Sequence, residues 1–213
     1  MFKLLAFCLL CLGLYLLKLV LSNNNMGYLS KVFSSNQNEN KESLSIENVE
    51  KGGVIGVSSV GASLDNFDIH IKTKHTFKRG SRSWSQLEGD TGESTVWIFF
   101  DDQNFSYLSL SLKKIQLCDL HLSIEDLSYM VNIGKSEIVY NSKTYFYEWG
   151  GTAFCYQDGL EENFERLSYW KFRTQNESYC ITIEKWDSGG VDVYLSESLS
   201  FSSVTVYKVK ENF

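Results

Sequence analysis

From about Leu44 to the C-terminus, the chain consists of short runs rich in Val, Ile, Tyr, Phe and Trp, separated by Gly, Asn, Asp and Ser. Runs of this length and composition predict β-strands joined by turns. The 213 residues include no proline, so the other turn-forming residues must make these turns. So many strands with so little helix argue against a parallel nucleotide-binding α/β sheet. We predict a mainly β (α+β) fold: an antiparallel curled sheet, a sandwich or a partly open barrel, with one or two short helices.

The predicted strands are spaced along the whole of this region. They cover residues 54–60, 67–77, 94–100, 107–112, 115–120, 136–140, 144–148, 152–156, 167–174, 179–186, 191–195 and 203–209. The segment LSIEDLSYM predicts a helix, with Ser123 as its N-cap and Asp126 three residues further on. A shorter helix is predicted over residues 160–166.

The N-terminal segment differs in composition from the rest of the chain. Lys3 precedes an apolar run over residues 4–17, so residues 1–21 are predicted to be a transmembrane anchor or a signal segment. An uncleaved helix implies a single-pass membrane protein, in the inner membrane if the source is bacterial. A cleaved one implies a secreted or periplasmic protein, and the weak charge bias leaves the side of the membrane open. Residues 22–43 are Asn-rich and predict a flexible linker, which leaves 44–213 as a single β-rich domain.

The stretch SYCITIEKWDSGGVDVYLSE is typical of a β-hairpin whose turn is Asp187-Ser-Gly-Gly190. Alternation along its first strand places Cys180, Thr182, Glu184 and Trp186 on one face. We expect Glu184 to be half-exposed and paired with a cross-strand Lys or Arg, so that replacing it with Gln changes stability by no more than about 1 kcal/mol. The alternative is a catalytic carboxylate, which requires a partner close in space.

Aromatic strands near the C-terminus are similar to those of one family. KTYFYEWGG holds Tyr145 and Trp149 at a Tyr-x-x-x-Trp spacing, and the hairpin strand holds Thr-Ile-Glu at 182–184. GGVIG and WIFFDDQNFSYLSL are similar to the family's Gly-Gly strand and its aspartate-bearing turn. From about Gly52 onward the chain therefore resembles the bacterial YjfK-like domains of unknown function and the related accessory domain found beside them. It departs from them in its N-terminal segment and at Tyr147, where the family has Arg.

This resemblance implies an accessory role, because such domains occur with membrane-stress proteins of the phage-shock type and with small membrane proteins. It supplies no catalytic residues. Trp149, Trp170 and Trp186 lie in or beside aromatic-rich strands, so we expect them, together with Tyr145 and Glu184, to have structural roles, and the three tryptophans to be largely buried.

Basic residues cluster in KTKHTFKRGSRSW, although the formal net charge of the chain is −6. The cluster consists of Lys72, Lys74, Lys78, Arg79 and Arg82. Alternation predicts that its lysines share an exposed strand face. A tether would hold this face near the bilayer, so these residues are candidates for contact with anionic lipid or with a partner. The acidic balance of the rest of the chain argues against nucleic acid.

Catalytic and metal-ligating residues are few. Cys118 and His121 have half of the spacing of a zinc site, but the only other histidines are His70 and His75. We expect no metal site and no cofactor. A nucleophilic cysteine would have to come from the three domain cysteines, at positions 118, 155 and 180. These three also exclude a dense disulfide framework, although one bridge remains possible.

Two functional interpretations remain. We favour a membrane-tethered, non-catalytic accessory domain of the bacterial envelope that binds a protein or lipid partner and acts in membrane-stress response. The alternative is a hydrolase-like enzyme with a cysteine or a carboxylate in a sheet-end pocket, the candidate carboxylates being Glu148, Asp158 and Glu184. The alternative requires His121, or two of these carboxylates, to meet in one cleft.

Overall fold

Short β-type runs and tight turns give this chain an almost wholly antiparallel structure. The computed structural model describes residues 44–58, 66–103, 107–133 and 136–210. All of them belong to the unit that spans 42–213. The predicted anchor and linker, residues 1–43, lie outside the described residues.

One antiparallel sheet contains eleven strands. They are β1 (Val54–Val57), β2 (Phe67–Arg79), β3 (Arg82–Asp90), β4 (Thr95–Asp101), β5 (Leu108–Ile115), β6 (Glu137–Tyr140), β7 (Lys143–Tyr156), β8 (Phe164–Thr174), β9 (Tyr179–Trp186), β10 (Val191–Ser198) and β11 (Val204–Lys208). The helical elements described are α3 (Ile124–Ile133) and the short 3-10 turns η1 (Ile46–Asn48), η2 (Leu117–Leu120), η3 (Gln157–Gly159) and η4 (Phe201–Ser203). The mainly β prediction is confirmed.

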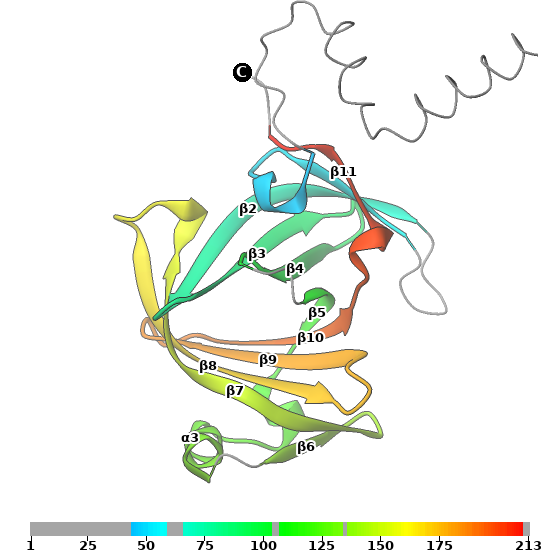
Figure 1. Cartoon of the computed structure of the whole chain (residues 1–213). Helices are drawn as coiled ribbons and strands as arrows, with labels where there is room; N and C mark the ends of the chain where they lie inside the picture. Colours follow the sequence, from blue (N-terminus) through cyan, green and yellow to red (C-terminus); the bar gives the residue numbers. More distant parts are fainter. Residues whose placement is uncertain (1–43, 59–65, 104–106, 134–135, 211–213) are drawn as a thin grey trace, which may run out of the picture. The chain divides into compact units, whose positions relative to one another are not determined.

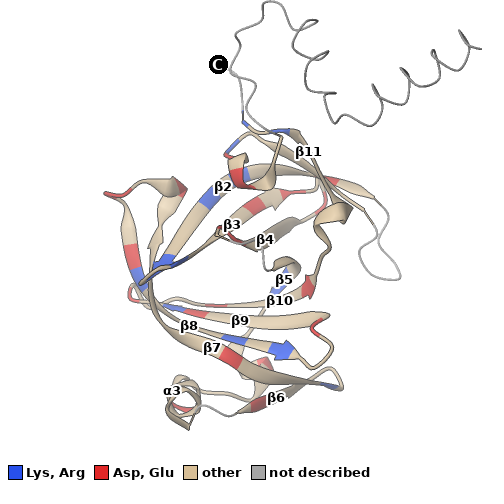
Figure 2. Cartoon of the chain, in the orientation of Figure 1, with Lys and Arg blue, Asp and Glu red and all other residues tan. Residues whose placement is uncertain are grey.

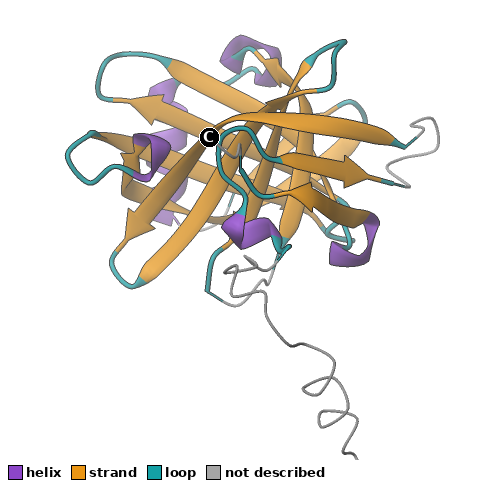
Figure 3. Cartoon of the chain, turned by 90° about the horizontal axis from the view of Figure 1, so that it is seen from above, coloured by secondary structure: helices purple, strands orange, loops and turns teal. Residues whose placement is uncertain are grey.

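The sheet curls until it partly closes on itself. Its strand order is β11-β1-β2-β3-β4-β5-β10-β9-β8-β7-β6, and β2 makes an additional pairing with β7. This closing pairing covers only Thr76–Tyr156, Phe77–Cys155 and Lys78–Phe154. The result is a partly ring-closed sheet rather than a barrel. Figure 1 shows β2, β3 and β4 on one side of the curl and β7 to β10 on the other, and Figure 3 shows the short helices at its periphery.

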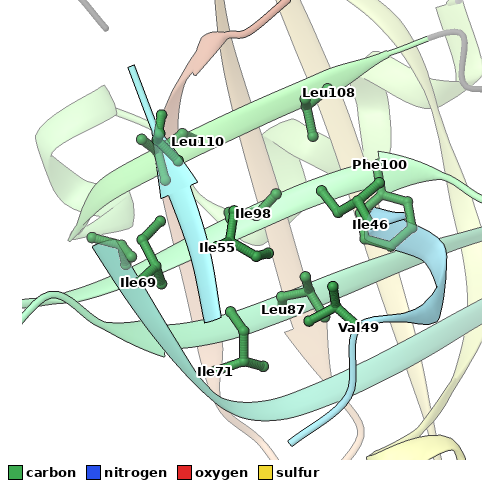
Figure 4. Packing of buried hydrophobic residues seen from close by; sticks show 12 residues of the cluster. Ile46, Val49, Ile55, Ile69, Ile71, Leu87, Ile98, Phe100, Leu108 and Leu110 are labelled. Atoms are coloured by element: carbon green, nitrogen blue, oxygen red, sulfur yellow. The ribbon is translucent and has the colours of Figure 1, made fainter. Parts of the chain in front are cut away.

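The first hydrophobic core lies on the outer face of β2 to β5. There β1, β11 and η1 fold over the sheet, so that Val49 and Ile55 pack with Leu87, Ile98 and Phe100 (Figure 4). The twelve buried residues of this cluster are almost all branched aliphatic, which suits a pleated surface that is covered on both sides. Gly89 has no room for a side chain here, because an added Cβ would lie 2.3 Å from a methyl carbon of Ile69.

The second hydrophobic core lies on the outer face of β8, β9 and β10, where α3 covers the sheet (Figure 1). Leu127 of α3 is fully buried and belongs to the same cluster as Phe172 and Ile183. The N-terminus of the helix is capped as predicted: the amide of Ser123 donates to the carboxylate of Asp126 at 2.8 Å, and the amide of Asp126 donates to the hydroxyl of Ser123 at 3.1 Å.

The local predictions differ from the structure in four places. No strand was predicted over the residues of β3, and residues 115–120 form the end of β5 followed by η2 rather than a strand. Residues 160–166 contain the start of β8 instead of a helix, and the two strands predicted over 144–148 and 152–156 are one strand, β7. The 179–186 strand is confirmed to the residue.

Candidate functional site

The inner face of the curled sheet carries polar and charged side chains as well as aromatic ones. Neighbouring strands place these side chains in rows: Lys171 of β8 is paired with Thr182 of β9, and Tyr169 is paired with Glu184. All four line one small inner pocket, together with Tyr107 and other aromatic residues. The predicted alternation in β9 is therefore confirmed, but its mixed face points into the curl rather than into solvent.

Glu184 is buried, which corrects the prediction of a half-exposed carboxylate. Its residue exposure is 1%, and its Oε2 atom has no hydrogen-bond partner among the described residues. The pKa of Glu184 is raised to about 8, chiefly by burial and also by the nearby carboxylate of Asp192, while the ammonium of Lys114 partly offsets the rise. At neutral pH this side chain is therefore mostly protonated and can donate a hydrogen bond.

Lys171 is the second buried ionisable group of the inner face, with 4% of its surface exposed. Its ammonium lies 3.4 Å from the centre of the Tyr107 ring and 5.8 Å from that of Trp149. Burial lowers its pKa, which carboxylates such as Glu148 partly offset. The aromatic faces stabilise the cation, but they replace only part of the hydration that burial removes.

A bulge in β7 turns Trp149 toward this pocket. The register with β8 shifts between Tyr147 and Trp149. Tyr147 therefore opposes Phe172 of the second hydrophobic core, whereas Trp149 opposes Lys171 of the inner face. Residues two apart in a regular strand share a face, and the extra residue, Glu148, breaks that rule.

A larger cleft of about 470 Å³ opens next to the inner pocket. The two spaces share Trp84, Tyr107 and Trp149 as walls. Charged residues of both signs line the rest of the cleft: Arg82, Asp101, Glu148 and Arg173. This volume is typical of small-molecule and side-chain binding sites.

The aromatic walls are held in place by one another. Trp84 stacks on Phe77 with 5.3 Å between ring centres, and it meets Trp149 edge-on, also at 5.3 Å. Trp149 lies 4.7 Å from Tyr169, whose hydroxyl accepts a hydrogen bond of 3.0 Å from Arg79. Such ring contacts fix side-chain orientation, so the cleft is preformed.

The five basic residues of the predicted cluster have separate neighbours. Lys72 lies 3.9 Å from Asp90 and Lys78 lies 3.7 Å from Glu161, whereas the ammonium of Lys74 contacts the carbonyl of Glu47. Figure 2 shows basic residues on β2 beside acidic residues on β3. Arg79 packs over Tyr169, and Arg82 lies 5.6 Å from the centre of the Trp149 ring. Of the five, only Arg82 lines the cleft.

The predicted structural residues divide between the two faces. Tyr145 and Trp170 belong to the second hydrophobic core, beside α3, and are 1% and 4% exposed. Trp149 and Trp186 lie on the inner side with intermediate burial, so Trp170 is the most buried of the three tryptophans that were expected to be largely buried. The indole of Trp186 donates to Asp192 at 3.1 Å.

The residues considered for nucleophilic or metal chemistry do not meet. Cys118 is exposed, Cys155 and Cys180 are buried, and the three are free thiols. Burial raises the pKa of Cys155 to about 12, which disfavours a thiolate. Neither His121 nor Cys118 lines the inner pocket or the cleft, and within the described residues no group of three or more His, Cys, Asp or Glu could hold a metal ion.

Two of the three candidate carboxylates line adjoining spaces rather than one cleft. Glu148 lines the cleft and Glu184 lines the inner pocket that adjoins it. Asp158 lies elsewhere, and its backbone amide is 3.4 Å from Nδ1 of His75.

Sequence reasoning missed Lys171, Arg173, Tyr107 and Trp84, which line the same two spaces. Alternation within β8 was the available signal, because it places Lys171 and Arg173 on the face opposite Trp170 and Phe172. Trp84 was missed because β3 was not predicted.

Comparison with known proteins identifies a family but no function. Residues 63–201 match the family described as Domain of unknown function (DUF4178), which covers more than half of the chain. The chain belongs to this family. No curated protein and no solved structure matches it.

Within the described residues, no helix is long and apolar enough to cross a membrane. The predicted anchor lies outside them.

Proposed function

We propose that this chain is a non-catalytic accessory domain that binds a protein partner in the cleft bounded by Trp84, Tyr107 and Trp149. The observation that carries the proposal is the cleft itself, about 470 Å³ in volume with preformed aromatic walls. Aromatic residues and arginine are enriched where proteins bind one another, because they offer large contact areas with few rotatable bonds. Arg82 supplies the arginine beside Trp149.

A protein partner is favoured over a lipid surface by the placement of the basic cluster. Attraction to anionic lipid requires several cations that face the same side and are free of protein carboxylates. Lys72 and Lys78 have acidic neighbours, and Arg79 is bonded to Tyr169. Arg82 alone lines the cleft, where one cation beside aromatic walls suits a specific contact.

The membrane tether and the membrane-stress role form the finer part of the proposal. The apolar run over residues 4–17 supports the tether. The resemblance to YjfK-like domains supports an accessory role beside envelope proteins of that system.

An enzymatic role is the second candidate, favoured by one observation. Glu148 and Glu184 line adjoining spaces and lie on β7 and β9, the two strands that flank β8 with its buried Lys171. A mostly protonated carboxyl group and an ionised carboxylate are the pair that acid–base hydrolysis requires. Glu148, however, lies 3.2 Å from Arg173 in an ion pair, and this pairing supports a structural role for it.

Capture from membranes tests the proposed function. The full-length protein, its Arg82→Glu variant and its Arg166→Glu variant are used to capture proteins from detergent-extracted membranes. Arg166 is a matched control, because it is an exposed arginine paired with Asp187 outside the cleft. We expect a specific partner with the wild type and the control and its loss with Arg82→Glu. A partner that both variants retain equally refutes binding at the cleft.

Fractionation tests the tether. The full-length chain should sediment with membranes, whereas a chain that begins at Ser43 should remain in the supernatant. Intact full-length protein in the supernatant would remove the anchor from the proposal, and a mature N-terminus near Asn23 would replace the anchor with secretion.

A further inference from the structure

The inner pocket contains a cation without an anionic partner. The side chain of Lys171 is 4% exposed, and within the described residues no carboxylate lies within ion-pair distance of its ammonium. Its neighbours are the rings of Tyr107 and Trp149. Lysine is almost never this buried unless it is paired, because desolvation of the ammonium costs more than ring contacts return. An unpaired ammonium in a pocket wall is therefore suited to an anion from outside the chain.

The nearest carboxylates of the cleft are already engaged. Glu148 is paired with Arg173 at 3.2 Å, and Asp101 accepts a hydrogen bond of 2.9 Å from the amide of Gln103. Both affect Lys171 only through the electrostatic field.

Glu184 is the other unsatisfied group of the pocket, and it does not repel an anion. Its Oε2 atom is buried without a hydrogen-bond partner among the described residues. Because its pKa is about 8, the side chain is mostly neutral at pH 7 and offers an O–H donor. Ser109 and Thr182 add hydroxyl groups to the same wall.

The space available limits the size of the ligand group. The inner pocket has a free volume of about 10 Å³, which corresponds to roughly one water position. The adjoining cleft of about 470 Å³ holds the rest of a ligand. A carboxylate that places one oxygen in the pocket fits this arrangement.

We propose that the inner pocket is a carboxylate-binding site, in which the ammonium of Lys171 pairs with a carboxylate of a ligand that lies in the cleft. This inference rests on the proposed function and deepens it by naming the chemical group that the partner presents. The carboxylate belongs either to a free small acid or to the C-terminus of a polypeptide, and the experiment distinguishes these sources.

Binding is measured by NMR on the full-length, isotope-labelled protein at constant ionic strength. The probes are sodium acetate, sodium chloride, and a short apolar peptide with either a free or an amidated C-terminus. The backbone amides of β8 and β9 around Lys171 and Thr182 should shift saturably with acetate and not with chloride. If the free-acid peptide binds more tightly than both acetate and its own amide, the source is a polypeptide C-terminus; if acetate binds as tightly, it is a free small acid.

Lys171→Met removes the charge and keeps the bulk of the side chain, and an apolar replacement of an unpaired buried charge should preserve the fold. Lys171→Gln is the second variant, and Lys185→Met, at an exposed position near the end of β9, is the matched control. We expect both Lys171 variants to bind carboxylates about thirty-fold more weakly or worse, with the control unchanged.

The inference is overturned if no carboxylate probe gives saturable shifts in the wild type, if chloride gives the same shifts, or if the Lys171 variants bind as the wild type does. If carboxylates fail to bind while Arg82→Glu still abolishes partner capture, the inference fails and the proposed function stands. If carboxylates fail to bind and Arg82→Glu also leaves partner capture unchanged, the cleft is not a binding site.

Discussion

Replacing Glu184 with Gln should stabilise the protein, and the gain should grow with pH. Glu184 has its pKa raised by burial to about 8 from the ordinary 4.5. The folded state therefore binds more protons than the unfolded state between these two values, so the contribution of this group to stability is complete below pH 4.5 and is lost as the pH rises toward 8. Gln has nearly the same shape and carries no charge at any pH.

The size of the effect follows from the two pKa values. Each pKa unit corresponds to about 1.4 kcal/mol, so the wild type should lose about 3 kcal/mol relative to Glu184→Gln between pH 4 and pH 7, and about 5 kcal/mol by pH 9. Asp192, on the neighbouring strand, and Lys114 are the charged groups that act on Glu184. This magnitude replaces the limit of about 1 kcal/mol that a half-exposed carboxylate implied.

Urea unfolding of the wild type and of Glu184→Gln at pH 4, 7 and 9 measures the difference in their free energies of unfolding. Groups that titrate identically in both proteins cancel from this difference. Glu137→Gln, which makes the same substitution at an exposed position of β6, is the matched control. A flat difference for Glu184→Gln, or a wild type that gains on the variant as the pH rises, would refute the burial of this carboxylate.

Three further outcomes follow from the described contacts. Trp170→Ala should lower the free energy of unfolding by about 3–5 kcal/mol, as seen by chemical denaturation, because the indole lies in the core beside α3; a change below about 1 kcal/mol contradicts that packing. Leu127→Ala should cost about 2–5 kcal/mol in the same assay, and an unchanged midpoint would mean that α3 does not dock as described. A thiol reagent followed by mass spectrometry should modify Cys118 in the native protein and reach Cys155 and Cys180 only after unfolding. Rapid native labelling of either buried thiol contradicts their burial.

Much of the fold could be predicted because strand alternation and helix capping are local. The β9 strand and the cap formed by Ser123 and Asp126 were predicted from a few neighbouring residues, and both are confirmed. Alternation states which side chains share a face, but it does not state what covers that face. Glu184 was therefore placed on the correct face and given the wrong environment, since the opposite wall of the curl comes from strands far away in the sequence.

The candidate site was harder to predict for the same reason. Trp149 enters the pocket through the β7 bulge, which no sequence period reveals. Lys171 lies on β8, whose opposite face belongs to the second hydrophobic core. The face that carries Lys171 is enclosed only because the sheet curls. The membrane anchor and the identity of a partner stay predictions, because they rest on the N-terminal sequence and on the resemblance.

The short pairing between β2 and β7 has a consequence for the dynamics of the domain. It joins two strands that are distant along the chain through three residue pairs, and a third hydrophobic cluster packs across it, with Phe77 of β2 and Cys155 of β7 fully buried. Opening this pairing would break few hydrogen bonds and leave the two outer cores packed, but it would expose the ring of Phe77, so side-chain burial rather than the hydrogen-bond ladder holds the curl closed. Phe77→Ala should therefore bring forward the exchange of the amides of residues 76–78 and 154–156 with solvent, relative to those of β8 and β9, and make the inner face transiently accessible without global unfolding.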